Sequence, residues 1–165
     1  MKRNQIEKRS AGFINLEGTV CLTDPCYDDD VWCRINDVKV VPGEYECIAW
    51  VSDDGEWGKR VAKLGVYLDG VVPAKSKFNR IPGEVGVDAG LAGVYLKKPN
   101  FTDDEWIRFC SMIHDEWPTV HLHSGDFDGR LVGFTTSSGY GDGGYDAYAK
   151  TNDDGLAEAI EIVFL

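Results

Sequence analysis

The densest group of chemically active residue types lies in the run SSGYGDGGYDAY, from Ser137 to Tyr148. Its Gly139, Gly141 and Gly144 match the G-x-G-x-x-G spacing of dinucleotide-binding loops, which must follow a strand and open a helix. The residues that come next, 145–150, alternate as a strand does, and no Gly-Lys-Ser or Gly-Lys-Thr sequence follows. The pattern therefore excludes a Rossmann loop and a P-loop, and it predicts a glycine-rich turn.

Polar side chains surround this turn and are candidates for binding a ligand. They are Ser137, Ser138, Tyr140, Asp142 and Tyr145. Consecutive glycine N–H groups can form a nest for an anion, although Asp142 and Asp146 oppose an anion unless a cation lies between them. The alternative is a long hairpin turn that is closed by Asx hydrogen bonds and holds no ligand.

A second acidic group lies between Leu22 and Cys33. Asp24 and Asp28–Asp30 provide carboxylate oxygens that suit Ca²⁺ or Mg²⁺, without the glycine and terminal glutamate of an EF-hand loop. Cys26 is a candidate nucleophile, although the neighbouring acids should raise the pKa of its thiol. Asp24 and Tyr27 join the candidate ligand-binding residues. A divalent cation is the one cofactor these residues suggest, and no other cofactor is expected.

Two histidines, His121 and His123, point to the same side if their segment is a strand, as metal ligands can. Asp126 and Asp128 follow closely, so a divalent site is one interpretation. The alternative is a pair of surface histidines beside a turn.

A basic segment precedes another acid. From Trp57 to Gly83 the chain carries six positive charges and one negative, on a protein of net charge −11. Lys75, Lys77 and Arg80 of this segment, together with Asp88 among small residues, are candidates for lining one pocket with the glycine-rich turn. The alternative is a solvated basic face, since charge runs are usually surface.

Turn signals recur along the chain and indicate the elements that carry these residues. Asp-Gly dipeptides between alternating apolar residues predict hairpins. They occur at 54–55, 69–70, 128–129, 142–143 and 154–155. In the closing strand, Ala157, Ala159, Ile162 and Phe164 do not share one parity, which predicts a bulge or burial on both faces.

One segment has helical periodicity. Thr102 and Glu105 have the spacing of a capping box, and Pro118 ends the segment. An apolar stripe at helical spacing should cover a core; it consists of Trp106, Phe109, Cys110 and Ile113. We predict a mainly β (α+β) fold, an antiparallel sheet arranged as a half-open barrel or sandwich, with one packed helix near 102–117. Residues 1–165 should form a single domain, with 1–11 as a flexible N-terminal segment.

Composition limits the partners. The net charge of −11 disfavours binding to a nucleic-acid polymer, because such binding neutralises phosphates with Lys and Arg. No apolar run approaches the roughly 20 residues of a membrane span. The five cysteines and the absence of an export signal predict free thiols and a cytoplasmic location, without a membrane partner.

Four segments resemble an uncharacterised family of small proteins from bacterial and phage genomes. They are DPCY at 24–27, VDAGLAG at 87–93, TSSGYGDGGYD at 136–146 and AIEIVF at 159–164. The resemblance implies a bacterial or phage origin, the host cytoplasm in the latter case, and the convergence of the four segments in space. It implies no activity, so no catalytic residue follows from it.

Three functions fit these patterns. The first is non-enzymatic binding of a polar small molecule, including a nucleotide-like signal that a phage protein would sequester from host immunity. The second is a metal-dependent hydrolase in which Asp24, Asp88, Asp142 and one of the histidines hold the ion. The third is a structural or interaction protein without a ligand, which could form a homo-oligomer. We favour binding, because no nucleophile, base and oxyanion donor can be assembled from the sequence.

Overall fold

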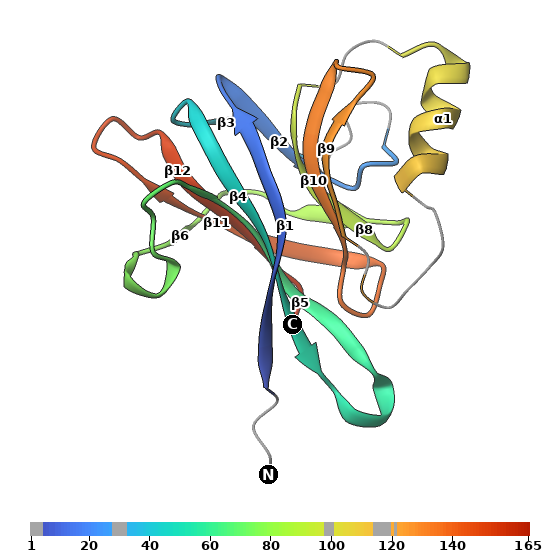
Figure 1. Cartoon of the computed structure of the whole chain (residues 1–165), viewed down its shortest axis with the longest axis horizontal. Coiled ribbons are helices and arrows are strands. Elements are labelled where there is room, and N and C mark those ends of the chain that lie inside the picture. The colour runs from blue at the N-terminus through green and yellow to red at the C-terminus, as the bar shows by residue number, and fades with distance from the viewer. Residues whose placement is uncertain (1–4, 28–32, 98–100, 114–119, 121) are drawn as a thin grey trace.

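Two antiparallel β-sheets face each other in the computed structural model of this chain, and one helix covers the outer face of the smaller sheet (Figure 1). The structure describes residues 5–27, 33–97, 101–113, 120 and 122–165. The sheets are not closed into a barrel. The predicted mainly β fold with a single helix is confirmed.

The larger sheet has seven strands. Its main path runs in the order β1 (Ile6–Leu16), β4 (Gly43–Asp53), β5 (Lys59–Leu68), β12 (Ala157–Val163), β11 (Gly143–Thr151) and β6 (Asn79–Arg80). The short strand β7 (Val85–Val87) also pairs with β11. Two 3-10 turns, η1 (Gly55–Trp57) and η2 (Pro73–Lys75), lie in the connections before and after β5.

The smaller sheet has five strands and carries the helix. Its order is β3 (Ile35–Lys39), β2 (Thr19–Thr23), β8 (Leu91–Leu96), β10 (Leu131–Ser137) and β9 (Leu122–Phe127). Helix α1 (Asp103–Ile113) begins at the predicted cap, where the Glu105 N–H donates to Thr102 Oγ1 at 3.3 Å. The predicted residues 114–117 of the helix lie outside the described part of the chain.

Strand alternation places the main core between the two sheets. On β4, Tyr45, Cys47, Ala49 and Val51 point inward and are buried, while Ile48 and Trp50 point outward. A second apolar cluster lies under α1, where Phe109 and Ile113 of the predicted stripe are buried, and Trp106 and Cys110 pack beside them. The helix is therefore a cover for the core, as its stripe indicates.

Several turn predictions are confirmed, and two are wrong. Hairpins at 54–55, 128–129 and 154–155 join β4 to β5, β9 to β10 and β11 to β12. The glycine-rich run at 142–143 is not a hairpin, because β10 pairs within the five-stranded sheet and β11 within the seven-stranded sheet. Asp69-Gly70 leads into η2 and not into a pairing strand. The glycine-rich run is therefore the passage of the chain from one sheet to the other.

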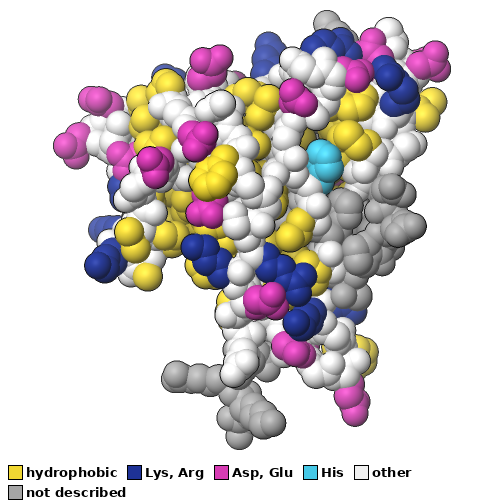
Figure 2. All heavy atoms as spheres, in the orientation of Figure 1, with side chains coloured by type: hydrophobic (Ala, Val, Ile, Leu, Met, Phe, Trp, Pro, Cys, Tyr) yellow, Lys and Arg dark blue, Asp and Glu magenta, His cyan; other side chains and the backbone are white. Residues whose placement is uncertain are grey.

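The N-terminal segment for which flexibility is predicted, 1–11, includes the start of a strand. Strand β1 begins at Ile6, and Ile6 to Ser10 pair with Ser52 to Ile48 on β4. This end of β1 leaves the body of the protein beside the β4–β5 hairpin (Figure 1). Acidic and basic side chains mix there (Figure 2), and Glu7 pairs with Arg9 and Lys59.

The 11 residues of α1 fall short of the length that a membrane-spanning helix needs, and no other α-helix is described. All five cysteines are free thiols, as predicted. Burial raises the pKa of the Cys47 thiol to about 12, which keeps this core cysteine protonated.

Candidate functional site

The buried carboxylate of Asp24 fastens two loops of the five-stranded sheet together. Its Oδ1 accepts the Cys26 N–H at 2.8 Å, and its Oδ2 accepts the N–H groups of Asp88 and Ala89 at 2.9 and 2.7 Å. The side chain is fully buried. A carboxylate that accepts three backbone hydrogen bonds is satisfied by the protein itself, so Asp24 serves the fold.

The glycine-rich run docks on the same loop. Asp142 Oδ1 accepts the Gly90 N–H at 3.0 Å, and the Ser138 N–H donates to the Gly90 carbonyl at 3.1 Å. The run then closes on itself, because the Tyr145 hydroxyl donates to the carbonyls of Ser138 and Gly141. Gly139 has φ +61°, and a Cβ there would meet Phe164. The run is therefore a defined crossover between the two sheets. Its backbone conformation at position 139 is one that glycine adopts without strain.

The four motif segments of the sequence, 24–27, 87–93, 136–146 and 159–164, meet in this region. Asp24 joins the first to the second, and Asp142 joins the second to the third. The Tyr145 ring packs edge-on against Phe164, with centroids 5.0 Å apart, which brings in the fourth. Their predicted convergence is confirmed, but the carboxylates and N–H groups that meet there bind one another.

The remaining predicted residues of this region have separate roles. Ser137 and Ser138 are buried, and the Ser138 hydroxyl donates to the Gly141 carbonyl at 2.7 Å. Tyr140 points away from Asp24: its hydroxyl donates to Asp54, and the Arg60 guanidinium lies over its ring. Burial and the neighbouring Cys33 thiol raise the pKa of Tyr27 to about 12.

The three predicted basic residues, Lys75, Lys77 and Arg80, form no contact with Asp24 in the described part of the chain. Arg80 forms an ion pair with Asp146 and donates to the Gly83 carbonyl, so its guanidinium is bound by residues at the edge of the sheet. Lys75 borders a separate cavity of about 430 Å³ with Lys150 and Glu158. Lys77 is exposed. Asp24, Asp88 and Asp142 line neither this cavity nor the cavities on the outer faces of the two sheets.

The metal prediction has no contact to support it. Within the described residues, no three His, Cys, Asp or Glu side chains are grouped so as to hold an ion. Asp28–Asp30 and His121 lie outside those residues. The metal-dependent hydrolase therefore stays a prediction of the sequence.

The partial burial of His123 on β9 should make the stability of the protein depend on pH. Desolvation lowers the pKa of His123 below its ordinary value of 6.5, so the unfolded chain takes up this proton first as the pH falls. Stability is therefore greatest above about pH 6.5 and is lost as the pH falls toward the lower pKa of the folded state. We expect the free energy of unfolding to fall less between pH 7 and 5.5 in His123→Gln than in the wild type. Urea titrations at several pH values measure both slopes, and equal slopes would contradict the prediction.

A different site lies on the outer face of the seven-stranded sheet. This outer-face groove has a volume of about 510 Å³, within the usual range for small-molecule sites. Its walls are mostly apolar and include three aromatic rings. It is lined by Ile6, Trp50, Ala62, Lys63, Phe78, Tyr148, Glu161, Val163 and Leu165. Five strands, the connection after η2 and the C-terminal Leu165 supply these residues, so the groove lies on the sheet itself.

Four polar side chains form a chain of contacts at the floor of the outer-face groove. The Trp50 indole N–H donates to the Tyr67 hydroxyl at 2.9 Å, and that hydroxyl donates to Glu161 Oε2 at 2.6 Å. Lys63 Nζ lies 2.8 Å from the same Oε2 and 5.0 Å from the centre of the Trp50 ring. Burial and the Glu161 charge raise the pKa of Tyr67 far above its ordinary value of 10, so its hydroxyl stays a donor.

Gly65 makes this arrangement sterically possible. It pairs with Glu161 across β5 and β12, and the Tyr67 ring lies over the space where a Gly65 side chain would be. A Cβ at position 65 would overlap the Tyr67 ring and its hydroxyl. The absence of a side chain at Gly65 thus lets Tyr67 lean along its own strand and reach Glu161.

The two oxygens of the Glu161 carboxylate have different surroundings. Glu161 is only 7% exposed, and its Oε2 accepts a hydrogen bond from Tyr67 and forms an ion pair with Lys63. Its Oε1 accepts no hydrogen bond from any residue that the structure describes. Buried carboxylate oxygens normally have partners, so Oε1 is the acceptor of this groove that the described residues leave available.

The sequence contains a signal for this groove that residue-type motifs miss. Lys63, Gly65 and Tyr67 fall on one face of β5 by their period of two, and Glu161 stands among apolar neighbours in the closing strand. The predicted burial of that strand on both faces is confirmed, since Ile160 and Ile162 point into the core while Glu161 faces the groove. Pairing order, which the sequence does not state, brings β4, β5 and β12 side by side.

Comparison with known proteins adds no relative to this description. No protein family, no curated protein and no solved structure matches the chain.

Proposed function

We propose that this protein binds a small molecule without transforming it, and that the outer-face groove takes an amino-substituted nitrogen heterocycle such as a nucleobase. The observation that carries the proposal is the unpaired Oε1 of the nearly buried Glu161, beside three aromatic rings. A planar heterocycle would stack on these rings, and its exocyclic amine would donate to Oε1.

Lys63 adds a donor next to this acceptor. Its ammonium group contacts Glu161 and the Trp50 ring, and an ammonium group has three N–H donors. An acceptor beside a donor matches the edge of adenine or cytosine, where an amine adjoins a ring nitrogen. Uracil also presents a donor beside an acceptor, its N3–H beside O4, so the proposal depends on the exocyclic amine as the group that donates to Oε1.

Binding without reaction would suit a protein that sequesters its ligand. A nucleotide-like signal, one of the ligands considered from the sequence, would carry such a base. In this proposal the ligand is released chemically unchanged, and the protein acts by lowering its free concentration.

Calorimetry with matched nucleosides tests the proposal. We expect adenosine and cytidine to bind, and purine riboside, which lacks the exocyclic amine, to bind about 10- to 100-fold more weakly, since a hydrogen bond to a charged group contributes about 1.5–3 kcal/mol. Equal affinity for adenosine and purine riboside, or no heat with adenosine and cytidine, would overturn it.

A further inference from the structure

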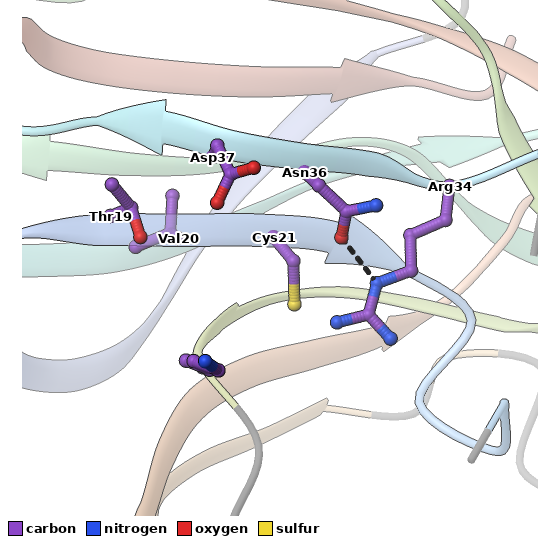
Figure 3. Close-up of a pocket in the computed structure, with 7 residues that line it drawn as sticks. Thr19, Val20, Cys21, Arg34, Asn36 and Asp37 are labelled. Carbon is purple, nitrogen blue, oxygen red and sulfur yellow. Dashed lines mark hydrogen bonds between the residues drawn. The ribbon is translucent and has the colours of Figure 1, made fainter. Parts of the chain in front are cut away.

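A second cavity lies on the opposite side of the protein, on the outer face of the five-stranded sheet (Figure 3). It has a volume of about 280 Å³ and lies over β2 and β3 next to Cys21, whose side chain points away from the main core. The outer-face groove belongs to the other sheet, so the two sites share no residue. Any ligand of this cavity would therefore bind independently of the groove.

A bulge in β3 shapes the wall of the cavity. Val20 pairs with Val38 and Leu22 with Ile35, so two residues of β3, Asn36 and Asp37, stand opposite the single residue Cys21 of β2. Asp37 has φ +57°, a conformation that costs free energy in residues other than glycine. Bulges of this kind redirect side chains and occur often beside functional sites.

Asn36, which the bulge positions, orients an arginine into the cavity. Arg34 Nε donates to Asn36 Oδ1 at 2.8 Å, and the two terminal nitrogens of the guanidinium point into the space beside Cys21 (Figure 3). Lys97 lines the same cavity from the end of β8. Neither Arg34 nor Lys97 forms an ion pair with an acidic side chain in the described part of the chain, although the protein carries a net charge of −11.

We infer that this cavity is a binding site for the phosphate group of a small molecule. An arginine held through its Nε keeps its two terminal N–H₂ groups for the oxygens of an anion, and a lysine adds a second positive charge. Arg34 and Lys97 give the cavity two positive charges against the single carboxylate of Asp37, which also lines it and pairs with neither cation in the described part of the chain. An anion between the two cations would reduce their mutual repulsion. The cavity has room for a phosphate and a few further atoms, and not for a macromolecule.

Titration with inorganic phosphate at constant ionic strength tests this inference. We expect phosphate to raise the melting temperature with saturation, where equal ionic strength of sodium chloride does not. Arg34→Gln and Lys97→Gln should each weaken phosphate binding about tenfold, as should Arg34→Lys, which keeps the charge but loses the planar fork.

Lys39→Gln is the matched control, because Lys39 is an exposed cation of the same strand and does not line the cavity. It should bind phosphate as the wild type does. The inference fails if chloride gives the same stabilisation, or if Lys39→Gln weakens phosphate binding as much as Arg34→Gln. Adenosine binding should be unchanged in all these variants. A failure of the phosphate site can therefore be told apart from a failure of the proposed adenosine binding in the outer-face groove.

Discussion

Replacing Asp24 by alanine is expected to lower the free energy of unfolding by about 3–5 kcal/mol, because it removes the acceptor of three backbone N–H groups. The N–H groups of Cys26, Asp88 and Ala89 would then need new partners where Asp24 is fully buried. For a chain of this length, the melting temperature should fall by roughly 6–20 °C. Urea denaturation and calorimetry measure the two quantities.

Asp88→Ala is the control for Asp24→Ala. Asp88 lies in the same loop cluster, but its side chain is exposed and it contributes its backbone N–H to Asp24. Its replacement should change stability by no more than about 0.5 kcal/mol. Asp24→Asn provides a variant of equal size: an amide nitrogen cannot accept the N–H groups that meet Oδ2, so it too should be destabilised. If Asp24→Ala and Asp88→Ala lose the same stability, the carboxylate does not fasten the loops.

The second large effect concerns ligand binding. Glu161→Gln should weaken adenosine binding about 10- to 100-fold, because it removes the negative charge that accepts the ligand amine and holds Lys63. The amide is nearly the same size as the carboxylate, so the groove keeps its shape. Calorimetric titration with adenosine measures the loss.

Glu158→Gln separates this effect from a general loss of charge. Glu158 lies on the same strand and pairs with Lys150, but it does not line the outer-face groove. Its replacement should leave adenosine affinity within a factor of about two, the change expected of a remote surface substitution. If both variants bind adenosine equally well, Glu161 is not the acceptor, and the assignment of the groove to an amino-heterocycle is wrong.

The sequence predicted the elements of the fold better than their connections. Hairpins such as Asp128-Gly129 follow from local turn chemistry, and the helix cap follows from Thr102 and Glu105. The glycine-rich run gives the same local signal as a hairpin, yet it carries the chain between sheets. Glycine permits the turn at this run, but long-range pairing decides which strands lie on either side of it.

The roles of single residues in the candidate site were also only partly predictable from the sequence. Motifs of acids and glycines correctly indicated which segments meet, but not that the Asp24 and Asp142 carboxylates would be used by backbone N–H groups. Conversely, Glu161 and Tyr67 are distant in the chain and no motif links them, so only the pairing of β5 with β12 brings them together. Clusters of polar residues in a sequence are therefore as consistent with loop fastening as with ligand binding.

The most direct test of the outer-face groove is an NMR titration that follows the indole N–H signals. The Trp50 indole donates to Tyr67 at the groove floor, whereas Trp57 is exposed in η1 at the β4–β5 turn. With Trp50→Phe used to assign the signal, addition of adenosine should shift the Trp50 resonance with saturation and leave the Trp57 resonance in place. A stationary Trp50 resonance, or equal shifts of both, would contradict the proposed binding of an amino-heterocycle in this groove.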